Sequence, residues 1–231
     1  MPLTVVRASM VALAFLVFSG IGFAQSPSAP ATPDADARWR ADLAAFEAAD
    51  HDHPQPPGGV LFVGSSSIRL WNGLEQQFGH VPVVIKRGLG GSRIDDFTRH
   101  LSRLVLRYRP RLVVVYAGDN DIAQGRSPKE VLASFQTFAT RLRQSLQATR
   151  IAFISIKPSP TRREFLPKVR QANALIEDWA GSRPWLDFID VYTPMTLADG
   201  APRPELFRAD GLHLNDAGYA LWRSIIADRL R

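Results

Sequence analysis

Two polar segments of this chain hold the residue types that a serine nucleophile requires. Ser65, Ser66 and Ser67 supply hydroxyl groups, and Asp210 lies three residues before His213. In a turn or at the start of a helix, that spacing lets the carboxylate meet the Nδ1–H of the imidazole, which leaves Nε2 as a base. Asp-x-x-His pairs occur by chance on many surfaces, but the serine-rich turn makes this one more informative. The chemistry indicated is nucleophilic catalysis by a serine.

These two segments belong to a set of four, and each member of the set follows an apolar, strand-like run. The runs and the segments after them are 60–63 with 64–67, 81–85 with 90–92, 112–116 with 118–121, and 185–192 with 210–213. A parallel sheet places the carboxyl ends of its strands along one edge, where ligands bind in open α/β folds. We therefore expect residues far apart in the sequence to converge on one crevice, as in an enzyme.

The elements that must position these residues follow from the apolar spacing beyond residue 38. Helical stripes, such as the one through Trp39, Leu43 and Phe46, alternate with short β-rich runs. The expected strands are Val60–Val63, Val81–Ile85, Leu112–Tyr116, Ile151–Ile156 and Leu186–Val191. Five strands separated by helices predict an α/β fold, a three-layer α/β/α domain with a five-stranded parallel sheet and flavodoxin-like order 2-1-3-4-5.

Particular residues also predict where two helices begin and which strand lies at the edge of the sheet. Ser127, Pro128 and Glu130 combine an N-cap, a proline at the first helical position and an acid two residues later. Asn215 is expected to cap a last helix. In Leu186–Val191, apolar residues alternate with aspartates, which favours an edge strand.

The first residues are typical of an export signal. Arg7 gives a positive start, Met10–Phe18 is an apolar run too short to span a bilayer comfortably, and Gly22-Phe23-Ala24 offers a cleavage site. We predict a signal peptide over 1–24, a proline-rich linker over 25–37 and one domain over 38–231. An uncleaved N-terminal anchor is the alternative. Cleavage would leave a periplasmic or secreted protein, with no stable membrane insertion.

The amino-acid composition argues against several classes of function. The chain has no cysteine, which excludes thiolate chemistry and cysteine metal sites. Its net charge of +6 is spread over several amphipathic segments, with no basic block and no aromatic-interleaved basic motif. Nucleic-acid binding therefore has little support, and solvated helix faces are the favoured interpretation.

Four blocks of the chain together resemble the SGNH hydrolases, also called the GDSL esterase/lipase family. Leu61–Ser66 is similar to the Gly-Asp-Ser block and Arg87–Ser92 to the glycine block. Gly118–Asp121 is similar to Gly-x-Asn-Asp, and Asp210–His213 matches Asp-x-x-His. The blocks agree in order and in their position after strands, over about residues 60–225.

The resemblance implies a role for individual residues. Ser66 would be the nucleophile, with His213 as its base and Asp210 orienting that base. The backbone N–H groups of Ser66 and Gly91 and the side-chain amide of Asn120 would hold the oxyanion. An acyl-enzyme would form on Ser66 and be hydrolysed by water. Such a mechanism requires no metal and no organic cofactor.

The chain departs from the family pattern at the residue before the nucleophile. The usual aspartate is replaced by Ser65. Because that acid is not a member of the triad, its loss need not abolish the chemistry. It would instead alter how the turn around Ser66 is held.

Other polar residues are weaker candidates. Lys157 and Ser159 follow the fourth strand, so we give them a role in substrate binding on position alone. His51-Asp52-His53 resembles a metal clip by composition but lies at a helix exit, and no metal site is predicted there. His80 and His100 are expected on the surface.

These observations predict an exported ester hydrolase acting on short-acyl or acetyl esters of lipids or glycans. An acyltransferase would use the same residues, with an acceptor hydroxyl in place of water. A binding module that has kept the fold and lost catalysis is a third hypothesis, and it predicts that a nucleophile, base or oxyanion donor is missing. The sequence leaves the acyl length, the leaving group and the oligomeric state open.

Overall fold

The computed structural model describes Met1 and residues 37–230. The chain divides into two units, Met1–Ala37 and Arg38–Arg231, and the second contains the sheet and the candidate site residues. The expected signal peptide and linker fall almost entirely outside the described residues, so both stay predictions. None of the helices in residues 37–230 is long and apolar enough to cross a bilayer.

Five parallel strands form the centre of the domain, in the order β2-β1-β3-β4-β5. They are β1 (Val60–Gly64), β2 (Val84–Gly88), β3 (Leu112–Tyr116), β4 (Arg150–Ile154) and β5 (Leu186–Ile189). In register, Gly64 of β1 pairs with Gly88 of β2 and with Tyr116 of β3. The predicted strand order and the edge position of the fifth strand are confirmed.

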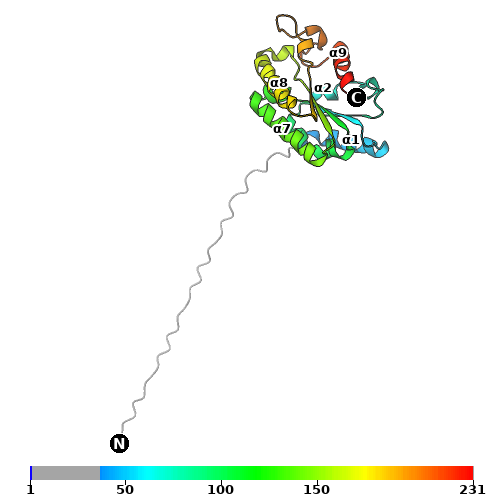
Figure 1. Ribbon diagram of the computed structural model, residues 1–231, viewed down its shortest axis with the longest axis vertical. Helices are drawn as coiled ribbons and strands as arrows, with labels where there is room; N and C mark the ends of the chain where they lie inside the picture. The colour runs from blue at the N-terminus through cyan, green and yellow to red at the C-terminus, as the bar shows by residue number, and fades with distance from the viewer. Residues whose placement is uncertain (2–36, 231) are drawn as a thin grey trace. The chain divides into compact units, whose positions relative to one another are not determined.

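Helices cover both faces of the sheet, which makes the predicted three layers (Figure 1). The helices are α1 (Arg40–Asp52), α2 (Ser66–Arg69), α3 (Leu74–Gln77), α4 (Ile94–Arg99), α5 (Leu101–Leu104), α6 (Asp119–Ala123), α7 (Pro128–Ser145), α8 (Leu166–Gly181) and α9 (Asp216–Ile226). Leu61 and Val63 of β1 pack in the core with α1, α4, α7 and α8. Val60 and Phe62 point to the other face, into the core with α2, α3 and α9. The central strands are buried on both sides, which explains their unbroken apolar sequences.

The second strand begins three residues later than predicted. The expected range was Val81–Ile85, but β2 runs from Val84 to Gly88. Pro82 interrupts the expected range, and proline has no N–H for a sheet ladder. The strand continues through polar residues because their charges are satisfied: Lys86 Nζ donates to the Trp71 carbonyl at 3.1 Å, and Arg87 pairs with buried Asp50.

Both predicted helix starts are confirmed. Ser127 Oγ accepts from the N–H of Glu130 at 3.3 Å, and the Glu130 carboxylate accepts from the N–H of Ser127 at 2.8 Å. This reciprocal capping box begins α7. At α9, Asn215 Oδ1 accepts from the N–H of Gly218 at 3.0 Å.

One surface prediction was wrong. His100 is only 4% exposed, because its ring packs edge-on against Trp39 with 6.5 Å between ring centroids. Helical spacing alone did not reveal this contact between the start of the domain and the break between α4 and α5. His80 is exposed, as expected.

Candidate active site

The four sequence segments meet at the carboxyl edge of the sheet. Ser66 is the first residue of α2, directly after β1, and Gly91 lies in the turn after β2. Asn120 lies in the first turn of α6, after β3. His213 lies in the loop before α9. All four line one cavity of about 440 Å³.

The serine, histidine and aspartate form a connected row. Ser66 Oγ lies 3.2 Å from His213 Nε2, and His213 Nδ1 lies 2.7 Å from Asp210 Oδ2. Both distances are within hydrogen-bond reach. The structure therefore brings together the three residues named as a triad from the sequence, with His213 placed to take the Ser66 proton and Asp210 placed to orient His213.

Local backbone bonds fix the aspartate–histidine pair. The loop is closed by an antiparallel bridge between Phe207 and Leu214, and the N–H of Arg208 donates to the His213 carbonyl at 2.8 Å. Inside it, Asp210 Oδ1 accepts from the backbone N–H groups of Leu212 and His213, each at 2.9 Å. These bonds and the His213 ring hold the pKa of Asp210 well below its usual range. The carboxylate thus stays ionised, as an orienting group for the imidazole must be.

The three donors expected for an oxyanion belong to residues that line the cavity of Ser66. The Ser66 N–H belongs to the first turn of α2, where a helix leaves its N–H groups without intrahelical acceptors. Gly91 adopts φ +72°, a left-handed conformation that glycine reaches without strain. Asn120 Nδ2 donates to the Ser92 carbonyl at 3.0 Å, which leaves its second N–H for a group in the cavity.

An ionic cluster that sequence reasoning missed supports Asn120. We define the Asp119 cluster as Asp119, Lys157 and Arg162. Asp119 Oδ2 lies 2.9 Å from Lys157 Nζ, and Asp119 Oδ1 lies 2.6 Å from Arg162 Nη1. Arg162 Nη2 in turn donates to Asn120 Oδ1 at 3.0 Å. Because Arg162 binds the carbonyl side of the Asn120 amide, the NH₂ side must face Ser92 and the cavity.

The charges of the Asp119 cluster reinforce each other. Burial alone would raise the pKa of Asp119, but the charges of Lys157 and Arg162 outweigh burial and hold that pKa below its ordinary value. Burial alone would lower the pKa of Lys157, and the Asp119 carboxylate reverses the direction. The buried pair of Asp119 and Lys157 is therefore held in its ionised form.

Lys157 and Ser159 do not reach the cavity, which corrects the prediction that they bind substrate. Lys157 is 2% exposed and Ser159 is 1% exposed. Lys157 Nζ is instead occupied by Asp119 and by Ser159 Oγ, the latter at 2.9 Å. The loop after β4 does border the site, but through Arg162, three residues beyond Ser159.

The same loop also holds the histidine segment. Thr161 Oγ1 donates to the Asp210 carbonyl, and the Thr161 N–H donates to the Gly211 carbonyl at 3.1 Å. Its neighbour Arg162 binds Asn120. Two adjacent residues thus join the Asp210–His213 loop to the start of α6, which fixes the base and the amide relative to each other.

The start of the domain forms another wall that the sequence did not predict. Arg38, Trp39 and Asp42 line the cavity beside the glycine turn. The buried indole of Trp39 donates Nε1–H to the Gly90 carbonyl at 3.2 Å. In the sequence, Trp39 was recognised only as part of a helical stripe.

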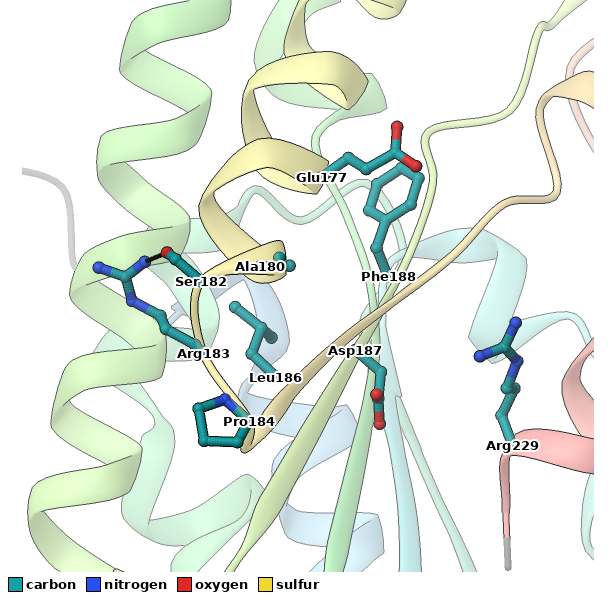
Figure 2. Close-up of a pocket in the computed structure, with 10 residues that line it drawn as sticks. Glu177, Ala180, Ser182, Arg183, Pro184, Leu186, Asp187, Phe188 and Arg229 are labelled. Carbon is teal, nitrogen blue, oxygen red and sulfur yellow. Dashed lines mark hydrogen bonds between the residues drawn. The ribbon is translucent and has the colours of Figure 1, made fainter.

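A larger hollow, of about 510 Å³, lies elsewhere, at the amino end of β5 (Figure 2). Arg183 and Ser182 are hydrogen-bonded to each other at 2.6 Å, and Asp187 pairs with Arg150 at 2.6 Å. This hollow contains no serine–histidine pair, and two of its charged side chains, Arg183 and Asp187, already have partners. It is therefore not the candidate active site. In the described part of the chain, no group of three or more metal-ligating side chains is found, including around His51-Asp52-His53.

Comparisons with known proteins agree with the fold and the order of the blocks. The model of the GDSL-like Lipase/Acylhydrolase family matches residues 59–221. A search of curated protein sequences found no significant match.

Solved structures show the same fold. A GDSL-like lipase from Bacteroides thetaiotaomicron VPI-5482 has a TM-score of 0.71 at 24% identity, covering 82% of this chain and 97% of that one. A Streptococcus pneumonia protein whose description names platelet activating factor has a TM-score of 0.74 at 22% identity, covering 84% and 94%. A catalytic mutant of an acetylxylan esterase from Geobacillus stearothermophilus has a TM-score of 0.62 at 14% identity, covering 76% and 95%.

The family match extends from the residue before β1 into α9 and so includes every residue of the serine–histidine–aspartate row. The strand order, the three-layer architecture and the order of the four blocks agree with this match. The chain belongs to the GDSL-like lipase/acylhydrolase family.

Proposed function

We propose that this protein is a serine ester hydrolase with Ser66, His213 and Asp210 as its catalytic triad. The observation that carries the proposal is the unbroken row from Ser66 Oγ to His213 Nε2 at 3.2 Å and from His213 Nδ1 to Asp210 at 2.7 Å. Membership in a family of lipases and acylhydrolases supports the same chemistry.

The reaction has two halves. Ser66 Oγ attacks the ester carbonyl carbon while His213 Nε2 takes the hydroxyl proton. The carbonyl oxygen becomes an oxyanion that accepts from the N–H groups of Ser66 and Gly91 and from the Asn120 amide. His213 then gives its proton to the leaving alcohol as the carbon–oxygen bond breaks. Water attacks the resulting acyl-enzyme in the same way, which releases the acid and restores the serine.

The walls of the cavity favour a short acyl group. Among the described residues that line it, only Trp39 and Leu212 bring large apolar side chains, while the other walls are glycine or polar. A long acyl chain would find little apolar surface to bury there. Acetyl or other short-acyl esters of glycans or lipids are therefore the proposed substrates. An acetylxylan esterase is among the proteins that share this fold.

A fluorophosphonate probe tests the proposal directly. We expect it to label the wild type and not Ser66→Ala, with circular dichroism showing that the variant is folded. A folded wild type that stays unlabelled would instead favour a binding module without catalysis. With p-nitrophenyl acetate, Asn120→Ala is expected to lower kcat by ~10²–10³, as for other oxyanion donors.

We also propose that the protein is exported, on the sequence of its first 24 residues alone. Cleavage after Ala24 would leave 207 residues beginning with Gln25. N-terminal sequencing of protein recovered outside the cytoplasm tests this. A chain recovered there that still begins at Met1 would contradict the cleavage and favour the uncleaved N-terminal anchor, and absence of the protein from outside the cytoplasm would contradict export.

A further inference from the structure

Two arginines lie over the turn that carries the proposed oxyanion donor. Arg38 and Arg69 both line the cavity that holds Ser66. A methyl group built on Gly90 would lie 2.8 Å from Nε of Arg69, and one built on Gly91 would overlap Nη2 of Arg38. The two guanidinium groups are therefore directed at the active-site backbone, although both side chains belong to exposed residues.

Neighbouring elements set where these arginines lie. Arg69 is the last residue of α2, the one-turn helix that begins with Ser66. Arg38 has its guanidinium over the Trp39 ring, 4.7 Å from the centroid. That indole is buried and bonded to the Gly90 carbonyl, so it anchors the start of the domain to the glycine turn.

Within residues 37–230, neither arginine forms an ion pair with a carboxylate. Asp42 is the one carboxylate among the described residues that line the cavity, and it is paired with neither of them. Many other arginines of the domain do have a carboxylate partner, among them Arg87, Arg103, Arg126, Arg150, Arg162 and Arg203. Arg38 and Arg69 thus offer open guanidinium forks beside the nucleophile.

A guanidinium fork matches the geometry of a carboxylate or a phosphate, to which it donates two parallel hydrogen bonds. We propose that Arg38 and Arg69 bind an anionic group of the substrate, and that the natural substrate is an ester with a carboxylate or phosphate close to the scissile bond. This inference rests on the proposed ester hydrolysis at Ser66. It extends that proposal by stating that the ester carries a negative charge.

The test compares matched pairs of esters that differ by one anionic group. Ethyl hydrogen succinate against ethyl butyrate places a carboxylate on the acyl side, and 4-acetoxybenzoate against phenyl acetate places it on the alcohol side. Acetylglycerol 3-phosphate against acetylglycerol places a phosphate there. Acid release at constant pH gives kcat/KM for each ester with the wild type, Arg38→Gln and Arg69→Gln. Arg141→Gln, at an exposed position on α7, is the matched control.

We expect the wild type to prefer the charged ester in at least one pair by about tenfold or more, as charge-assisted hydrogen bonds predict. Each of Arg38→Gln and Arg69→Gln should lower that ratio by about tenfold, and the control should leave it unchanged. Added salt should lower the ratio for the wild type, because both guanidiniums are open to solvent.

Equal rates within every pair for the wild type would overturn the inference. So would an equal loss on charged and neutral esters in both arginine variants, because that pattern means that the guanidiniums stabilise the oxyanion. If the wild type hydrolyses no ester and Ser66 is not labelled by a fluorophosphonate, the proposed function itself fails, and the inference fails with it. Thermal unfolding of each variant shows whether a lost rate reflects a lost fold.

Discussion

Two buried ionic clusters lie in this domain, and only one of them touches the candidate active site. The Asp119 cluster ends at Asn120, which lines the cavity. The second, which we define as the Asp50 cluster, consists of Asp50, Arg87 and Tyr108. Asp50 Oδ1 pairs with Arg87, Asp50 Oδ2 accepts from the Tyr108 hydroxyl at 2.5 Å, and Arg87 Nε donates to the same hydroxyl at 2.7 Å.

The clusters are alike in burial and differ in where their hydrogen bonds lead. Asp50 and Asp119 are 8% and 6% exposed. The Asp50 cluster lies between α1 and β2 and extends outward to the exposed Arg107, 3.9 Å from Asp50, and burial raises the pKa of its tyrosine to about 12. None of its members lines the cavity of Ser66. A buried ion pair alone therefore does not indicate a functional role in this protein. What distinguishes the Asp119 cluster is the hydrogen bond from Arg162 to Asn120, a residue that lines the cavity.

Of the substitutions considered, Asp119→Ala is expected to have the largest effect on stability and activity together. Asp119→Ala would leave Lys157 buried without its counter-charge and would release Arg162. We expect a loss of about 3–5 kcal/mol in the free energy of unfolding, as for other broken buried ion pairs. We also expect a lower kcat for p-nitrophenyl acetate in the protein that remains folded. Urea unfolding and kinetics at low temperature measure both effects. Wild-type values for both would refute the role of the cluster.

Asp50→Ala separates stability from catalysis. It removes the partner of Arg87 and Tyr108, so we expect the free energy of unfolding to fall by about 3 kcal/mol. Unlike Asp119→Ala, it should leave kcat within about twofold of the wild type, because no hydrogen bond runs from this cluster to the cavity. A loss of kcat as large as that of Asp119→Ala would remove the distinction between the two clusters.

A third buried carboxylate, Asp121, sharpens the comparison because no ion pair reaches it among the described residues. Its Oδ1 accepts a long bond from the Ile94 N–H at 3.4 Å, and burial raises its pKa to about 6. The folded protein therefore holds this proton more tightly than the unfolded chain. The contribution of Asp121 to the free energy of unfolding should therefore fall as pH rises from about 4 to about 6 and level off above that.

Asp121→Asn should remove this dependence and stabilise the protein at pH 7 by up to about 3 kcal/mol, since each pKa unit corresponds to about 1.4 kcal/mol. Urea unfolding of wild type and variant at several pH values between 4 and 7 measures it. The same slope in both proteins would show that another group is responsible.

Much of this architecture could be predicted from the sequence because its causes are local. Strands buried on both faces are unbroken apolar runs, and Leu112–Tyr116 was predicted to the residue. Ser127 and Asn215 bond to N–H groups three residues away, so their capping roles are visible in a short window. The spacing of Asp210 and His213 is equally local, and the structure pairs them at 2.7 Å.

The supports of the site could not be predicted because they join residues distant in sequence. Arg162 reaches Asn120 across 42 positions, and Trp39 reaches Gly90 across 51. The interpretation of Lys157 as a substrate contact failed for the same reason, since its partner Asp119 lies 38 positions away. One signal was present: Asp119 lies three residues after a buried strand, where an ionised carboxylate favours a cationic partner, and the loop after the fourth strand holds several cations.

The smallest effect we predict concerns Arg162, which acts through Asn120. Arg162→Met should lower kcat for p-nitrophenyl acetate by about tenfold with little change in KM, because the Asn120 amide loses the bond that orients it. In an Asn120→Ala background, the same substitution should have no further effect on kcat, since no amide remains to be oriented. Arg162→Lys should restore part of the rate, because it keeps a donor beside Asn120 Oδ1. Additive losses in the double variant would mean that Arg162 does not work through Asn120, and the two ionic clusters would then differ only in position.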